Sequence, residues 1–234
     1  MNDKAPKFVE QIICLANSRK ITGRCVAGKR MGDKSWCRPV SNRPGREISE
    51  FDQRYPDGET AKLLDVISVP CIKKVPDGHQ SENVLIDDRF YWENRGRASW
   101  QEILALVDQN ADLWANGFHA YYNKNNRVPK AYIDRDSGSL RLIYLEKIVL
   151  HAQPKAPEFG NMKPIVRASF VYKNQEYRLD LTDPEHEAIC LKKGTGEYSL
   201  SSAVACVSLT ETYEQKMAKF LPTNLSLPSS RRRG

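Results

Sequence analysis

Residues 9–40, VEQIICLANSRKITGRCVAGKRMGDKSWCRPV, contain three short apolar segments that are separated by polar turns. Segments 9–15 and 22–28 are bounded by the asparagine, serine and glycine residues that commonly flank β-strands. Segment 36–40 predicts a third strand, in which Pro39 favours an edge or a strand end because proline cannot donate to the ladder. This stretch therefore predicts a fold built from short strands.

The rest of the chain continues the pattern, with few helical signals. Ser99 and Glu102 form the capping box that starts a helix, and Asp183 before Pro184 predicts a second short helix. The fold class is predicted to be mainly β, or β-rich α+β, with one or two short helices. Five further segments are apolar or alternate polar and apolar residues, and are expected to be strands: 63–72, 140–151, 165–173, 176–182 and 203–209.

Short strands of this kind must close or curl to protect their edges, so two tandem small barrels are expected. Prolines and a glycine between residues 153 and 164 predict a linker. The first barrel, with an inserted helix and loops, is then expected over 8–152 and the second over 165–221. Residues 222–234, which include three consecutive arginines, are expected to form a disordered basic tail.

Positive charge is concentrated near the start of the chain. Nine lysines and arginines lie within residues 18–46 against one acidic residue, in a chain of net charge +7. Trp36 and Arg38 stand two apart on a predicted strand, so they share a face, as a stacking ring beside a phosphate contact requires. We therefore predict a nucleic-acid-binding surface formed by Arg19, Lys20, Arg24, Lys29, Arg30, Trp36, Arg38, Arg43 and Arg46. In the alternative interpretation, Trp36 fills the core and the cations only solubilise loops.

Three other regions contain residue types that can read bases or stack on them. Amide side chains follow the turn at 76–78, aromatic and basic residues alternate over 89–97, and a polar and aromatic loop over 116–127 could cover a pocket. The first region is better explained as a cap of the following strand and the second as core and surface, whereas the third can equally be a packed surface loop. The candidates for secondary contacts are Gln80, Asn83, Trp92, Arg95, His119 and Arg127.

Seven landmarks also carry a family resemblance: CLANSRK, GRCVAGK, WCRPVS, LLDVISVP, HQSEN, NNRVP and LTDP. Their order resembles that of prokaryotic proteins with a dual OB-containing domain, over about residues 8–221. The resemblance implies two tandem OB-like barrels, nucleic-acid binding and a connection to bacterial conflict or phage-defence systems. It brings no established catalytic residues. Cys37 stands where the family is expected to have an aliphatic residue, and it can pack there as a small hydrophobe.

Enzymatic signals are weak in this sequence. The phosphate-loop, nucleophile-elbow and HExxH patterns are absent and the four histidines are dispersed, so we expect a non-enzymatic protein without cofactor or metal. No apolar run approaches the roughly 18 residues of a membrane helix, and residues 1–11 do not read as a signal peptide. We therefore expect a cytoplasmic protein that does not contact membranes. Two alternatives stay open: an interaction subunit that docks an acidic effector protein, and a nucleotide-sensing domain that uses the loop around His119.

Overall fold

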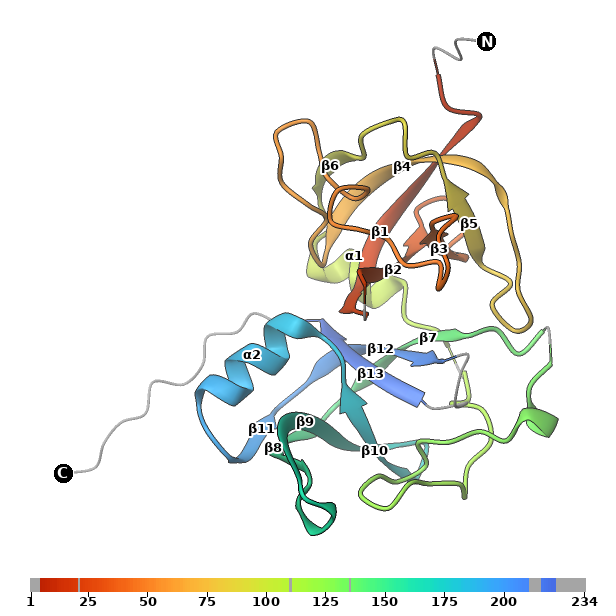
Figure 1. Ribbon diagram of the computed structural model, residues 1–234. Coiled ribbons are helices and arrows are strands. Elements are labelled where there is room, and N and C mark those ends of the chain that lie inside the picture. The colour runs from red at the N-terminus through yellow and green to blue at the C-terminus, as the bar shows by residue number, and fades with distance from the viewer. Residues whose placement is uncertain (1–4, 21, 110, 135, 211–215, 222–234) are drawn as a thin grey trace.

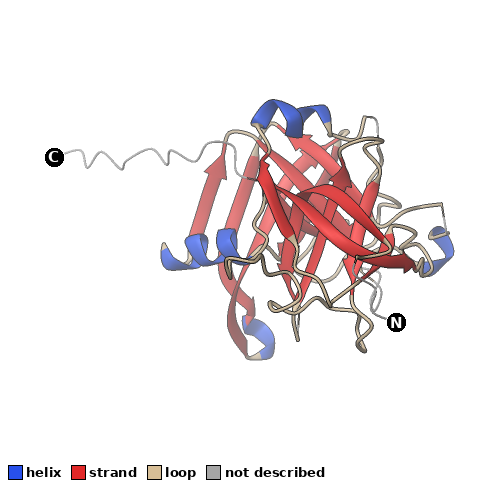
Figure 2. Cartoon of the chain, turned by 90° about the horizontal axis from the view of Figure 1, so that it is seen from above, coloured by secondary structure: helices blue, strands red, loops and turns tan. Residues whose placement is uncertain are grey.

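Strands dominate the computed structural model, which describes residues 5–20, 22–109, 111–134, 136–210 and 216–221 (Figure 1). They form two β-rich units that lie one above the other in Figure 1, and the view from above shows how few helices accompany them (Figure 2). The predicted tail, 222–234, lies outside the described residues.

The first unit is a closed barrel of five strands. β1 pairs with β2 and with β4, and the circuit runs β1-β2-β3-β5-β4 and back to β1. β3 and β5 are parallel, and the other neighbours in this circuit are antiparallel. This is the arrangement of an OB barrel. The strands are β1 Phe8–Arg19, β2 Arg24–Arg30, β3 Trp36–Val40, β4 Asp65–Lys74 and β5 Asn83–Ile86, and β6 Glu93–Arg97 extends the sheet beside β4.

The second unit repeats this circuit. β7 and β8 are separated only by Glu146 and Lys147, and together they take the place of the single strand β1. β7 pairs with β12 and β8 pairs with β9, as the two halves of β1 pair with β4 and β2, while β10 and β13 are parallel. The strands are β7 Leu140–Leu145, β8 Ile148–Ala156, β9 Asn161–Tyr172, β10 Gln175–Leu181, β11 Gly196–Leu200, β12 Ala203–Leu209 and β13 Lys216–Leu221.

Both predicted α-helices are confirmed. α1, Trp100–Ala105, begins at Ser99, whose side chain accepts from the backbone N–H of Glu102 in a complete capping box. α2, Pro184–Lys192, begins at Asp183, whose carboxylate accepts from the backbone N–H of His186. Two short 3-10 helices, Lys130–Tyr132 and Pro157–Phe159, lie in connecting segments.

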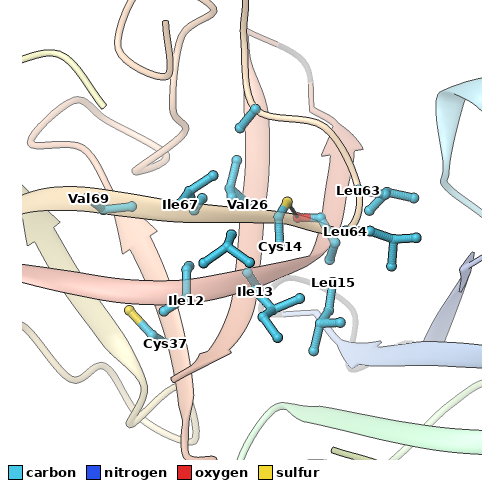
Figure 3. Close-up of a cluster of buried hydrophobic side chains, with 14 of the residues drawn as sticks. Ile12, Ile13, Cys14, Leu15, Val26, Cys37, Leu63, Leu64, Ile67 and Val69 are labelled. Atoms are coloured by element: carbon cyan, nitrogen blue, oxygen red, sulfur yellow. Dashed lines mark hydrogen bonds between the residues drawn. The ribbon is translucent and has the colours of Figure 1, made fainter. Parts of the chain in front are cut away.

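The two barrels share a hydrophobic core through β7 and β12. Leu142 and Cys206 belong to the core of the first barrel, part of which is shown in Figure 3, whereas Ile143 and Ala205 belong to the core of the second. Side chains alternate between the two faces of a strand, so β12 is covered on both sides. This explains why six of its seven residues are apolar, and it holds the barrels together.

Two expectations are corrected here. Residues 153–164 are not a linker, because they close the β8–β9 hairpin, in which Pro154 is opposite Pro164. The prolines and Gly160 mark the turn of this hairpin, so the second barrel begins at β7 and the connection between barrels is residues 98–139. Of the two alternatives for Pro39, the edge strand is wrong, because β3 lies between β2 and β5 with Pro39 opposite Val84, and the strand end is confirmed, because Pro39 is the last residue but one of β3. Cys37 lies fully buried in the first core, as a small hydrophobe does.

Candidate nucleic-acid interface

The cations of the basic window 18–46 are mostly paired with acidic side chains of the same barrel. Arg19 and Lys20 lie exposed at the end of β1, and within the described part of the chain they form no ion pair. The ion pairs formed by the other cations reduce the positive field that a polyanion would meet at this surface. The partners are Glu50 for Arg24, Glu10 for Arg30, Asp52 for Arg43 and Asp77 for Arg46.

Lys29 and Arg38 are internal. Lys29, only 4% exposed, donates from Nζ to the carbonyl of Leu106 at 2.7 Å and to the carboxylate of Asp108. Arg38, 5% exposed, pairs with Glu82 at 2.9 Å, and its guanidinium also bonds to Ser139 across the junction between the barrels. Neither side chain is accessible to a phosphate, so these two predicted contacts stabilise the junction instead.

Trp36 lies on the same outer face of the first barrel as Lys29 and Arg38. It is opposite Lys29 in the β2–β3 ladder, and the Lys29 Nζ lies 5.3 Å from the centre of its ring. OB folds bind oligonucleotides on the outer face of the second and third strands. In the first barrel this face is covered, because Leu106, Asp108 and Ser139 contact it from the connection between the barrels.

The secondary candidates divide into buried and exposed residues. Gln80 and Asn83 are buried and bond to each other at 3.2 Å, and Trp92 is 0% exposed in the first core. Arg95 is exposed and pairs with Glu93. His119 and Arg127 are exposed on the loop beside the second barrel. The structure therefore does not bring the predicted contacts together into one surface.

The outer face of β8, β9 and β10 in the second barrel corresponds to the face that is covered in the first. The loop 118–127 lies along its edge, where Lys124 and Arg178 exchange backbone hydrogen bonds of 3.1 and 2.9 Å. A hollow of about 1040 Å³ lies between this loop and the strands. The side chains that point outward from the three strands are Val149, His151, Gln153, Arg167, Ser169, Val171, Glu176, Arg178 and Asp180.

Two arginines on this face have unused hydrogen-bond donors. The side chain of Arg167 is 4% exposed, pairs with Asp180 at 3.3 Å and donates to Asn123 Oδ1 and to the carbonyl of Lys155, both at 2.8 Å, but its Nη1 has no partner among the described residues. Nε of Arg178 and the hydroxyl of Tyr122 are also buried, and neither has a partner in the part of the chain that the structure describes. Buried donors are nearly always satisfied in native proteins, so three such donors near one face favour a bound acceptor.

Exposed aromatic rings stand at the end of this face. Phe159, at the tip of the β8–β9 hairpin, is 73% exposed, and Tyr121 on the neighbouring loop is 78% exposed. Their rings meet edge to face at 5.8 Å, and Tyr121 also meets Tyr122 at 4.9 Å. Lys155 and Lys163 are exposed on the two strands of the same hairpin. Rings and cations in this arrangement suit stacked bases and phosphates.

His151 lies on this face between a carboxylate and a hydroxyl group. Its Nδ1 lies 2.9 Å from a Glu197 carboxylate oxygen, which only accepts, so Nδ1 carries a proton and Nε2 can accept from Ser169 at 2.9 Å. Burial, followed by the charge of Arg178, lowers the pKa of His151 from its usual 6.5. The cations on this face are therefore the arginines and lysines.

Phe159 is not predicted as a site residue, because the prolines and glycine of its hairpin are also typical of a linker, whereas the aromatic composition of the loop 116–127 does indicate Tyr121 and Tyr122. In the described ranges, no three His, Cys, Asp or Glu side chains group closely enough to hold a metal ion. The helices described are too short or too polar to cross a membrane.

A family model described as a dual OB-containing domain matches residues 10–221. Comparison with curated proteins and with solved structures finds no match. Domains that contain OB folds commonly bind nucleic acids.

Proposed function

Because the chain belongs to the family of proteins with a dual OB-containing domain, we propose that it binds single-stranded nucleic acid on the outer face of its second barrel. One observation carries the proposal: this face has exposed rings and unpartnered arginine donors, whereas the corresponding face of the first barrel is covered. The proposal moves the contact away from the basic window, where six of the nine cations are engaged in ion pairs.

The chemistry of the face divides between its two ends. Tyr121 and Phe159 offer exposed rings on which bases stack, a contact that depends little on base identity. Arg178, which is half-buried, lies further along the strands, where its unused Nε–H can donate to a phosphate oxygen, whereas Arg167 is buried and pairs with Asp180 at 3.3 Å. Lys155 and Lys163 add charge beside the rings. A nucleic-acid strand that lies along the β8–β9 hairpin would contact the aromatic rings at its tip and then, further along the sheet, the guanidinium of Arg178.

A single strand suits these features better than a duplex. In a duplex the bases are stacked on each other and are not available to protein rings, whereas unpaired bases can stack on Tyr121 and Phe159. If this face contacted only the phosphates of a duplex, its two rings that are more than 70% exposed would not contribute to the affinity.

Fluorescence anisotropy of the whole chain with labelled single-stranded DNA, single-stranded RNA and duplex DNA tests this function. We expect a single-stranded probe to bind most tightly, with affinity that falls as salt rises. The absence of binding to all three probes at low salt would remove the proposal, and equal affinity for the duplex would remove its single-strand part.

A further inference from the structure

A crevice of about 510 Å³ lies at the side of the junction between the barrels, away from the face described above. The first barrel contributes β3 with the preceding turn, the end of β4 and residues 81–84. Residues 138–141, at the start of β7, form the opposite wall. A second hollow of about 710 Å³, which contains Trp114, shares Trp36, Asp108 and Arg141 with it. The volume of the first crevice, about 510 Å³, lies within the range of about 300–1,000 Å³ that is typical of small-molecule sites.

The walls of the crevice carry three cations that form no ion pair with the acidic side chains of the described residues. Lys34 approaches only the carbonyl of Ala105, at 3.4 Å, and Lys74 is exposed with no ion pair in the part of the chain that the structure describes. Arg141 is fixed by backbone carbonyls, among them those of Ser137 at 2.6 Å and Leu140 at 2.8 Å.

The acidic residues that line the crevice are already neutralised. Glu82 pairs with Arg38, and Asp108 pairs with Lys29. The remaining charge of the crevice is therefore positive and belongs to Lys34, Lys74 and Arg141.

Two buried polar atoms in the same walls have no hydrogen-bond partner within the described ranges. Nε1 of Trp36 is a donor without an acceptor, and Oδ1 of Asn83 is an acceptor without a donor. Asn83 is 0% exposed, and its amide nitrogen already donates to Gln80. A ligand that offers both a donor and an acceptor would satisfy both atoms.

We propose that this crevice binds a nucleoside phosphate. The phosphate lies beside Lys34, Lys74 and Arg141, and the base lies against Trp36, where its edge can meet Nε1 of Trp36 and Oδ1 of Asn83. Trp36 and Lys34 belong to the first barrel and Arg141 to the second, so the ligand contacts both sides of the junction. This site is separate from the strand-binding face, and it does not depend on the proposed function.

Isothermal titration of the whole chain with the 5′-monophosphates and 5′-triphosphates of adenosine, guanosine, cytidine and uridine tests the proposal. We expect at least one nucleotide to bind and to raise the thermal unfolding temperature, because it binds the folded chain only. The double variant Lys34→Ala, Lys74→Ala should bind about tenfold more weakly or worse, as expected for loss of charge-assisted contacts.

Lys73→Ala is the matched control, because Lys73 neighbours Lys74 on β4 but does not line the crevice. It should bind as the unmodified chain does. Trp36→Phe keeps an aromatic ring and removes the N–H, so it should also weaken binding. No binding by any nucleotide, or equal binding by the double variant and the control, would overturn the proposal.

Competition with oligonucleotides distinguishes a site for a free nucleotide from a site for the 5′ end of a nucleic-acid strand. If a 5′-phosphorylated oligonucleotide displaces the bound nucleotide and the 5′-hydroxyl form does not, the crevice takes a strand terminus. If neither displaces it, the ligand is the free nucleotide. Because Tyr121→Ala should affect only the second-barrel face, it should leave nucleotide binding unchanged, so the two proposals can fail separately.

Discussion

The guanidinium of Arg38 bonds to the hydroxyl of Ser139 at 2.5 Å, and so joins β3 of the first barrel to the residue before β7 of the second. Glu82 accepts from both side chains at this buried point. A second internal cation, Lys29, bonds to Asp108, whose carboxylate also accepts from the backbone N–H of Leu142 at 2.7 Å. Lys29 and Arg38, which the sequence suggested as ligand contacts, therefore hold the two barrels together.

Arg38→Ala should lower the free energy of unfolding by about 3 kcal/mol or more, because it leaves the carboxylate of Glu82 buried without its partner. Chemical denaturation measures this loss. Lys62→Ala removes an exposed pair with Glu59, in which both side chains are 63% exposed, and should cost less than about 1 kcal/mol. If the Arg38→Ala variant keeps the free energy of unfolding of the unmodified chain but loses affinity for nucleic acid, Arg38 is a ligand contact.

Gly28→Ala should destabilise the first barrel. A Cβ at Gly28 would lie 2.1 Å from the carbonyl oxygen of Ile13, at the bulge where β1 bends between its two partners. Such overpacking costs about 1–3 kcal/mol. Gly32→Ala is the control, since nothing lies within 4 Å of a Cβ there. Equal midpoints of thermal unfolding for the two variants would contradict this account of barrel closure.

The local elements could be predicted from the sequence because their causes are local. Alternation and turn residues predict most strands of both barrels, and the capping boxes or N-caps at Ser99 and Asp183 predict both helices. The boundary between barrels could not be predicted in this way. Proline and glycine occur both in hairpin turns and in linkers, and only the pairing of Pro154 with Pro164 separates the two cases.

The site was harder to predict because it depends on contacts between distant residues. Lys29 bonds to Asp108 and Arg38 to Ser139, which lie 79 and 101 residues away, so burial of these cations cannot be predicted from the basic window itself. The pairing of Phe159 with Tyr121 likewise requires the hairpin and the loop to meet in space. What the sequence does indicate is the class of partner, through the cations and aromatic rings that it contains.

His151 should make stability depend on pH below neutrality. Burial lowers its pKa from 6.5, so as pH falls below 6.5 the unfolded chain takes up this proton before the folded chain does. The contribution of His151 is therefore complete above its unfolded pKa and is lost as pH falls through its lowered folded pKa. His151→Gln should flatten the dependence of the unfolding free energy on pH between about 7 and 5. An unchanged slope in the variant would argue against a desolvated imidazole.

Lys155→Gln with Lys163→Gln should weaken single-strand binding and reduce its salt dependence. For a single strand, the slope of log affinity against log salt concentration changes by about 0.7 for each phosphate that the protein no longer neutralises. Anisotropy titrations at several salt concentrations give this slope. The control pair, Lys62→Gln with Lys73→Gln, lies on the first barrel and should keep the original slope. If the Lys62 and Lys73 variant has the smaller salt slope and the Lys155 and Lys163 variant does not, the nucleic acid contacts the first barrel.

The most direct test of the account compares two pairs of exposed rings by anisotropy with one labelled single-stranded probe. Tyr121→Ala with Phe159→Ala removes the rings of the second-barrel face, and Phe51→Ala with Tyr91→Ala removes first-barrel rings that are 61% and 50% exposed. The first pair should weaken binding by more than about tenfold, since each stacked base contributes about 1–3 kcal/mol, and the second pair should have no effect. Unchanged affinity in the first pair, or a comparable loss in both, would contradict binding at the second barrel.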